Sequence, residues 1–332
     1  MGQTQQALAR TGANAVLKTS TLHCRYNLPT QLHCNCIKVT MASVYFKQVD
    51  VFTKVRFSGN PVAVVLCADA LSTEKMQQIA NWTNLSETTF VVPITDPRAD
   101  YHVRIFTPNA ELPFAGHPTI GTAHALLEAG LIEAKEGVLV QQCGVGLVKL
   151  RVEPGEDGAK WIFFDLPEPT MTELNAAEIQ AMEAILGTSL KQFPTPCLVD
   201  VGARWVVVQL PSAQAVLQAR PDLLRMKEQD LKRRHTGVVI FGEHERNAPG
   251  RIEVRAFAPA HGIDEDPVCG SGNGCVGAYL RHTRQTGHFG EDFLATQGAA
   301  IRRAGMIRLI LNGNAVQVGG NAITCVDGTL SV

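Results

Sequence analysis

The sequence predicts an α+β protein built from two similar lobes, and three observations indicate that fold class. The chain of 332 residues is long enough for two domains with a substantial core. Its strand-like runs are short and cluster together, with one dominant helix in each half, which disfavours a doubly wound parallel sheet. The third observation is an internal match between Val103–Gly130 and Val254–Leu280.

The two matching stretches read VRIFTPNAELPFAGHPTIGTAHALLEAG and VRAFAPAHGIDEDPVCGSGNGCVGAYL. Each opens with the frame Val-Arg-x-Phe-x-Pro, passes an acidic turn that contains proline, and reaches a glycine at the start of a helix. A spacing near half the chain is too long for a solenoid, so we interpret the match as one ancestral lobe used twice. The alternative is two unrelated strand-loop-helix units that share a few letters.

Composition and charge disfavour several classes of protein. Apolar residues make up 45% of the chain and charged residues 18%, which is typical of a globular protein and not of a disordered one. A formal net charge of −1 gives no reason to expect nucleic acid or an anionic membrane as a partner. No apolar run reaches the roughly 18 residues of a membrane-spanning helix. The nine scattered cysteines form no disulfide pattern, which favours the cytoplasm.

Residues 1–40 differ from the rest because they contain no Asp or Glu and are rich in Ser, Thr and Gln. Such a leader resembles an organelle transit peptide, and its His and Cys residues match no zinc spacing. We expect residues 1–40 to be a disordered extension. An N-terminal lobe should then span 41–165, with the C-terminal strand able to return to it, and a C-terminal lobe should span 166–332.

The elements of the first half follow from periodicity and helix caps. Residues 45–52 alternate as a half-buried strand, and the Gly-Asn-Pro turn at 59–61 leads into a second apolar strand. Ser72 is suited to cap a helix that runs to about Asn84, and Glu87 precedes the next strand. Further strands are expected at 137–143, 146–152 and 160–166.

The second half has a similar order of elements. A helix near 174–186 precedes strands near 197–201 and 205–210, and a helix around 221–232 leads to the strand HTGVVIFGE. After the second matching stretch, the tail (LATQGAAIRR, MIRLILNG, AVQVGG, AITCVDGTLSV) reads as short strands joined by turns that contain glycine.

The two predicted helix starts form the candidate binding site. A helix N-terminus leaves its first N–H groups unpaired and carries partial positive charge, and a glycine there lets a ligand approach the backbone. Gly116 opens the first helix, while Gly270 and Ser271, a natural N-cap, open the second. If the two lobes face each other, these starts would hold one carboxylate of a small substrate.

Three side chains near the helix starts are candidates for proton transfer. Glu87 lies just before an apolar strand, where partial desolvation would raise its pKa. His117 could donate a proton or a hydrogen bond, and Asp266 precedes the second helix, where negative charge is favoured. The structural alternatives are a solvated surface acid for Glu87, a capping histidine for His117 and plain helix capping for Asp266.

Cys269 also lies at the second helix start, where the helix dipole would lower the pKa of its thiol. A symmetric two-thiol racemase would need a second thiol at Ala115, which cannot serve. The string GSGNG at 270–274 lacks the full dinucleotide-binding pattern. Because Cys269 and Cys275 are too isolated for a metal site, we expect no metal there.

Together these motifs resemble the phenazine-biosynthesis PhzF family, within the diaminopimelate epimerase fold superfamily. The resemblance is carried by FKQVDVFTKVRFSGNPVAVV, NLSETTFV, RIFTPNAELPFAGHPTIGTAHAL and DEDPVCGSGNGC. It implies two pseudo-symmetric lobes, each a small, mostly antiparallel sheet or barrel around a central helix, with the active site between them. It also implies a cofactor-free isomerase and a homodimer.

The same motifs carry residue roles over from the family. By this resemblance Glu87 matches the acid/base glutamate, and His117 and Asp266 match polar active-site residues. The carboxylate-binding helix starts correspond to Gly116, Gly270 and Ser271.

The family's best-known reaction is isomerisation of trans-2,3-dihydro-3-hydroxyanthranilate, in which one glutamate moves a proton between ring carbons. We therefore expect a cofactor-independent isomerase that acts at carbon on a small carboxylate. Two alternatives stay open at this point: an amino-acid racemase or epimerase that uses Cys269, and a non-catalytic binding protein of the same fold.

Overall fold

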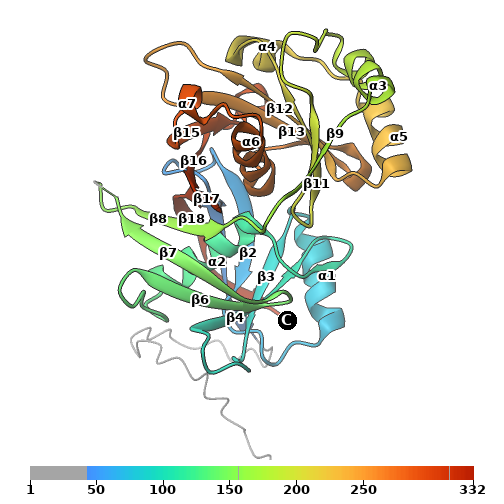
Figure 1. Ribbon diagram of the computed structural model, residues 1–332. Coiled ribbons are helices and arrows are strands. Elements are labelled where there is room, and N and C mark those ends of the chain that lie inside the picture. The colour runs from blue at the N-terminus through green and yellow to red at the C-terminus, as the bar shows by residue number, and fades with distance from the viewer. Residues whose placement is uncertain (1–42, 156, 314) are drawn as a thin grey trace, which may run out of the picture. The chain divides into compact units, whose positions relative to one another are not determined.

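The computed structural model describes residues 43–332 except 156 and 314, all of which fall within one compact unit (Figure 1). The extension expected over 1–40, with its His and Cys residues, lies outside the described residues. Within the described part, no helix is both long and apolar enough to cross a membrane.

The first half of the described chain contains mostly strands and two α-helices. Their bounds are β1 (Ser43–Val51), β2 (Asn60–Val65), α1 (Thr73–Thr83), β3 (Thr88–Val92), β4 (Tyr101–Phe106), β5 (Glu111–Leu112), α2 (Gly116–Glu128), β6 (Val138–Cys143), β7 (Gly146–Pro154) and β8 (Lys160–Asp165). The helix expected from Ser72 to Asn84 is confirmed, because the Ser72 hydroxyl caps α1 and Asn84 ends it in the left-handed conformation.

The second half repeats this mixture and adds helices on its outside. Its elements are β9 (Thr170–Glu173), α3 (Ala176–Leu186), β10 (Cys197–Asp200), β11 (Arg204–Gln209), α4 (Ala213–Gln218), α5 (Leu223–Arg233), β12 (Gly237–Glu243), β13 (Ile252–Ala258), the 3-10 turn η1 (Pro259–His261), β14 (Ile263–Asp266), α6 (Gly270–His282), α7 (Thr286–Phe289), β15 (Asp292–Gln297), η2 (Ala299–Ile301), β16 (Gly305–Asn312), β17 (Ala315–Gly320) and β18 (Ala322–Ser331). The sequence patterns missed β9, α4 and α7, and took the short strands β5 and β14 for turns.

The strand pairing of the first lobe recurs in the second. β2 runs parallel to β3, β3 antiparallel to β4, and β4 pairs antiparallel with β5 and parallel with β6. The strands from β11 to β15 repeat each of these pairings in the same order and direction. The antiparallel runs β6–β7–β8 and β15–β16–β17 also correspond. The match seen in the sequence therefore extends over a whole lobe.

Each lobe is completed by a strand that follows the other lobe in the chain. β18 pairs antiparallel with β1 over its full length, with one bulge between Gln48 and Val49. β9, which follows β8, pairs antiparallel with β10 in the second lobe. Between the lobes, β8 pairs antiparallel with β17 and joins all strands into one continuous ladder. The two lobes are thus interlocked by exchanged strands.

A single helix occupies the centre of each lobe. Most residues of α2 are buried, and so are ten of the thirteen residues of α6, as expected for helices with no extended polar face. α2 contacts β1, β2, β3, β8 and β18, whereas α6 contacts β10, β11, β12, β16 and β17 (Figure 1). The two central helices also contact each other, which confirms the predicted fold class.

Candidate active site

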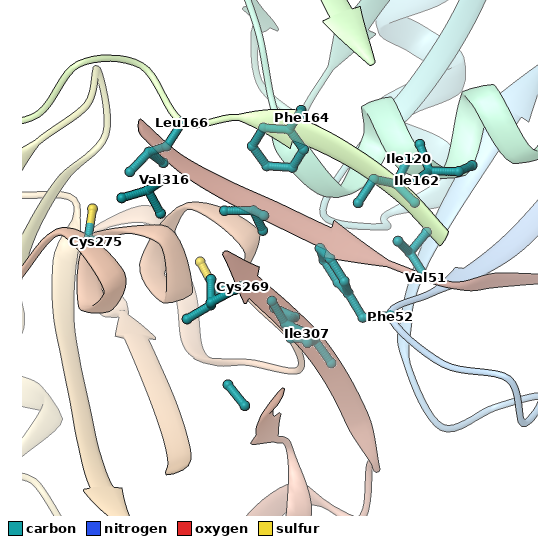
Figure 2. Packing of buried hydrophobic residues seen from close by; sticks show 14 of the residues in the cluster. Val51, Phe52, Ile120, Ile162, Phe164, Leu166, Cys269, Cys275, Ile307 and Val316 are labelled. Atoms are coloured by element: carbon teal, nitrogen blue, oxygen red, sulfur yellow. The ribbon is translucent and has the colours of Figure 1, made fainter. Parts of the chain in front are cut away.

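The starts of α2 and α6 both lie next to the ring of Phe164. A Cβ atom added to Gly116 would lie 2.5 Å from Cζ of Phe164, and one added to Gly270 would lie 3.6 Å from the same atom and 3.2 Å from Cζ of Phe52. Figure 2 shows Phe164, Phe52 and Cys269 in one buried cluster. Gly116 is therefore required because the Phe164 ring closes on its backbone, and the two helix starts lie close together.

The start of α2 leaves two backbone donors open. Its N-cap, Ala115, supplies no side-chain hydrogen bond, and Pro118 has no N–H group to satisfy. The N–H groups of Gly116 and His117 have no partner among residues 43–332 as described. An N-terminus with free N–H groups and positive dipole potential is suited to an anion.

The start of α6 also leaves two backbone N–H groups open, but for a different structural reason. Its N-cap is Cys269, whose Sγ accepts a hydrogen bond from the N–H of Gly272 at 3.3 Å. This bond satisfies the third N–H group of the helix. The N–H groups of Gly270 and Ser271 have no acceptor within the described part of the chain. The pair of helix starts therefore presents four N–H groups near one ring.

Ser271 is not the N-cap that the sequence suggested. It is the second residue of α6, and its Oγ accepts a hydrogen bond from Nε1 of Trp205 on β11 at 3.0 Å. A buried indole N–H needs an acceptor. The hydrogen bond from Trp205 therefore holds the Ser271 hydroxyl toward β11. What Ser271 offers a ligand most directly is thus its backbone N–H.

Glu87 and His117 form a close pair inside the first lobe. Glu87 precedes β3, its side chain is 16% exposed, and its Oε2 lies 3.3 Å from Nδ1 of His117. Burial, with a smaller contribution from the charge of Asp266, raises the pKa of Glu87 to about 8. Burial also lowers the pKa of His117 to about 4, against a weak opposing effect of the Pro61 carbonyl. Near neutral pH the pair is a protonated acid beside a neutral imidazole, and not an ion pair.

Asp266 ends β14 and brings a second carboxyl group to the same site. Its Oδ1 accepts hydrogen bonds from Nδ2 of Asn60 and from the N–H of Val268, each at 3.0 Å. Burial raises the pKa of Asp266 to about 6, while hydrogen bonds from Val268 and from the Cys269 thiol oppose this rise and the charge of Glu265 adds to it. Its charge in turn raises the pKa of Glu87. The structure therefore brings all three predicted acid/base candidates together.

The sequence patterns did not reveal the side chains that hold Asp266. Asn60, the first residue of β2, donates to the Asp266 carboxylate and also to the carbonyl of Val268 at 3.0 Å. Gln297 at the end of β15 accepts from the N–H of Cys269 and donates to the carbonyl of Asp266. The Gly-Asn-Pro turn was a usable signal for Asn60, because a buried amide at a strand start needs partners. Nothing near Gln297 distinguishes it from an ordinary strand residue.

The expected low pKa of Cys269 is wrong. Burial, followed by the negative charge of Asp266, raises the pKa of this thiol well above its usual value and outweighs the hydrogen bonds from Ser271 and Gly272. Ala115 occupies the corresponding N-cap position of α2. No group of three or more His, Cys, Asp or Glu side chains in the described chain is placed to hold a metal ion.

Comparison with known proteins gives consistent matches over most of the chain. The family model described as phenazine biosynthesis-like protein (PhzC-PhzF) matches residues 49–328. Antisense-enhancing sequence 1 of Schizosaccharomyces pombe is 42% identical, with 85% of this chain and 97% of that protein covered. Trans-2,3-dihydro-3-hydroxyanthranilate isomerase of Pseudomonas chlororaphis is 34% identical at the same coverage. The crystal structure of a phenazine biosynthesis protein from Bacillus anthracis, described there as of the PhzF family, aligns with a TM-score of 0.76 and 24% identity, over 88% of this chain and 100% of that one.

Proposed function

Because the chain belongs to the phenazine biosynthesis-like family and is an isomerase, we propose that it moves a proton at carbon on a small carboxylate-bearing substrate without a cofactor. The observation that carries this proposal is a pair of carboxyl groups with different pKa values, Glu87 and Asp266, beside four N–H groups that have no acceptor among the described residues. Such a pair is a frequent basis for acid/base catalysis.

The substrate carboxylate would bind at the two helix starts. The N–H groups of Gly116 and His117 on one side and of Gly270 and Ser271 on the other have no competing acceptor in the described structure. Fixed N–H donors cost no reorganisation when charge develops, so they would also stabilise an anionic transition state. A ligand-bound crystal structure tests this arrangement, and a carboxylate bound elsewhere would contradict it.

Glu87 would remove the proton from one carbon and return it to another. A carboxylate whose conjugate acid has a pKa of about 8 is a stronger base than an ordinary glutamate. His117, neutral and with its Nε2 lacking a hydrogen-bond partner in the described structure, would orient the substrate by a hydrogen bond. Asp266 would maintain the negative potential that keeps Glu87 basic.

The substrate class is proposed from the relatives. Several of them are named as isomerases of trans-2,3-dihydro-3-hydroxyanthranilate, so this compound and related cyclic carboxylates are the first candidates. From the resemblance we also propose a cytoplasmic homodimer. The scattered cysteines of the sequence are typical of a reducing compartment, and analytical ultracentrifugation tests the dimer.

The deciding experiment incubates a panel of small carboxylates, including trans-2,3-dihydro-3-hydroxyanthranilate, with the protein in deuterated water. Wild type, Glu87→Gln and the exposed control Glu133→Gln are compared by NMR. We expect wild type and the control to incorporate deuterium at carbon, and Glu87→Gln to be slower by roughly 10²- to 10⁴-fold. Near-wild-type turnover of Glu87→Gln would exclude Glu87 as the base.

The pH dependence gives a second test. If Glu87 begins the reaction as a base, only its ionised form is active, and kcat/KM should rise with pH until about pH 8. Well below that pH, each lower pH unit should reduce kcat/KM about tenfold. A decrease in kcat/KM as the pH approaches 8 would mean that protonated Glu87 is the active form, contrary to the proposed first step.

A further inference from the structure

We propose that Trp205 is a positioning residue that takes, in the second lobe, the place that Glu87 has in the first, and holds the backbone N–H of Ser271 ready for the substrate carboxylate. This inference rests on the proposed function and deepens it. At equivalent positions the first lobe supplies an acid/base group and the second lobe a hydrogen-bond donor. Trp205 lies on β11, outside the two matching stretches that predicted the site.

The second residue of each central helix is contacted by one of these two side chains. In α2 this residue is His117, whose Nδ1 lies 3.3 Å from Oε2 of Glu87. In α6 it is Ser271, whose Oγ accepts a hydrogen bond from Nε1 of Trp205 at 3.0 Å. The other neighbour of this oxygen, the sulfur of Cys269, is farther away at 3.6 Å. Glu87 and Trp205 therefore hold equivalent helix positions, although an indole N–H can only donate.

Strand register explains why the second lobe has no acid at this position. Gly237 corresponds to Glu87, because each lies one residue before the first pair that β12 forms with β13 and that β3 forms with β4. Trp205 pairs with Gly237 across β11 and β12. A Cβ added to Gly237 would lie 2.9 Å from Cζ3 of Trp205 and 1.9 Å from the carbonyl oxygen of Phe257. The indole ring and the backbone thus exclude a side chain at Gly237.

The first lobe has the reverse combination of large and small side chains. By the same register, Val62 on β2 takes the position that Trp205 has on β11. Valine is much smaller than tryptophan and has no hydrogen-bond donor in its side chain, so it leaves room for the carboxyl group of Glu87. Valine with glutamate in one lobe, and tryptophan with glycine in the other, therefore fill equivalent spaces beside the central helix.

The hydrogen bond from Trp205 fixes the first turn of α6. Trp205 is only 3% exposed, so its indole N–H depends on the Ser271 oxygen, and a shift of Ser271 would leave a buried donor unpaired. The backbone N–H of Ser271, which has no acceptor among the residues that the structure describes, is held in place by the same bond. A donor that is already fixed costs no reorganisation when it binds an anion.

The first test measures the binding of benzoate, a simple cyclic carboxylate, by calorimetry. Trp205→Phe retains a ring but not the donor, and should weaken benzoate binding roughly 2- to 10-fold, the change expected for one lost hydrogen bond. Ser271→Ala removes the same bond and should have a similar effect. Because the two changes break one bond, the double variant should bind benzoate about as well as either single variant. Trp82→Phe, at a tryptophan that is 75% exposed, is the control and should bind like wild type.

Nitrogen-15 NMR follows the two N–H groups directly. The indole signal of Trp205, one of three in the chain, is assigned with Trp205→Phe, and in Ser271→Ala it should move and exchange faster with deuterated water. Benzoate should shift the backbone signal of Ser271 in wild type. An unmoved Ser271 signal, wild-type benzoate affinity in the folded Trp205→Phe protein, or additive effects of the two changes would each overturn the proposal. Should Trp205→Phe fail to fold, Ser271→Ala tests the same bond.

Activity then separates positioning from direct catalysis. With an accepted substrate, Trp205→Phe should raise KM by about the factor found for benzoate and should leave the pH dependence of kcat unchanged, because Glu87 is untouched. Loss of kcat by roughly 10²-fold at unchanged KM would assign Trp205 to the chemical step and would overturn the positioning role. If no carboxylate exchanges deuterium, the proposed function fails, while the benzoate and NMR results still decide the role of Trp205.

Discussion

The starts of α2 and α6 offer a ligand the same groups, although different residues free them. In α2 the third helical position is Pro118, which has no N–H, and the N-cap is an alanine. In α6 the third position is Gly272, whose N–H is taken by the sulfur of Cys269. In both helices the first two N–H groups are left without an acceptor in the part of the chain that the structure describes. The two lobes therefore present the same backbone groups although the side chains around them differ.

The two acids Glu87 and Asp266, in contrast, are not shared between the lobes. Each has a counterpart in the other lobe that is not acidic. By strand register, Ile105 pairs with Leu112 in the first lobe, as Ala256 pairs with Asp266 in the second. Asp266 thus corresponds to a leucine. By the same reasoning the counterpart of Glu87 is Gly237, where an added Cβ would lie 1.9 Å from the carbonyl oxygen of Phe257. A nearly symmetric frame therefore carries a chemically asymmetric site.

The largest difference between the two starts should appear when a methyl group is added to each first glycine. Gly116→Ala would place Cβ 2.5 Å from the Phe164 ring, whereas Gly270→Ala meets Phe52 at 3.2 Å. We expect Gly116→Ala to lower the free energy of unfolding by about 1–3 kcal/mol and Gly270→Ala to cost clearly less. Thermal unfolding of both variants measures this.

A compensating change provides the control for the glycine pair. Phe164→Leu removes the ring atoms that meet the added methyl group. Gly116→Ala should therefore lower the free energy of unfolding less in a Phe164→Leu protein than in the wild-type protein. Equal costs for Gly116→Ala and Gly270→Ala would show that the ring does not distinguish the two starts.

A smaller effect is expected from substitution of Asn60. This side chain of the first lobe donates a hydrogen bond to Asp266 of the second lobe. Asn60→Ala removes donors from Asp266 and from the buried carbonyl of Val268, and should cost roughly 1–2 kcal/mol in unfolding free energy. It should also raise the pKa of Asp266, as seen by NMR. A pKa that stays at about 6 in Asn60→Ala would show that Asp266 does not depend on the other lobe.

The smallest effect should come from giving α2 the kind of cap that α6 has. Ala115→Ser supplies a hydroxyl at the N-cap, where serine ordinarily stabilises a helix by bonding the second or third N–H group. Here the third residue is Pro118, so the gain in unfolding free energy should be under about 0.5 kcal/mol. The hydroxyl would instead compete for the N–H of His117 and raise KM. A clear gain in stability with unchanged KM would contradict the view that this N–H is reserved for the substrate.

The parts of this fold that the sequence predicts are those with local signals. Ser72 and Asn84 cap α1 as expected, and Gly116 and Gly270 begin α2 and α6. β9 was missed because its residues, TMTE, are largely exposed and have no apolar alternation. Its pairing with β10 comes from tertiary context, which a short window of sequence does not contain.

The candidate site was predictable in its backbone and its acids, and not in its supporting contacts. Glu87, His117 and Asp266 were recognisable from short motifs, but the bonds from Asn60 and Trp205 join residues far apart in the chain. The pKa of Cys269 was misjudged because the helix dipole can be expected from the sequence, while burial and the nearby charge of Asp266 require coordinates.

The exchange of β9 and β18 between the lobes has a consequence for biosynthesis. β1 ends at Val51, and the strand that covers its edge begins only at Ala322. At ribosomal speeds of about 5–20 residues per second, β1 would wait roughly a quarter of a minute to a minute for this partner. The nascent first lobe thus emerges with an open sheet edge, which is a known route to aggregation, and chaperone protection during translation should matter more for this chain than for one whose lobes close independently.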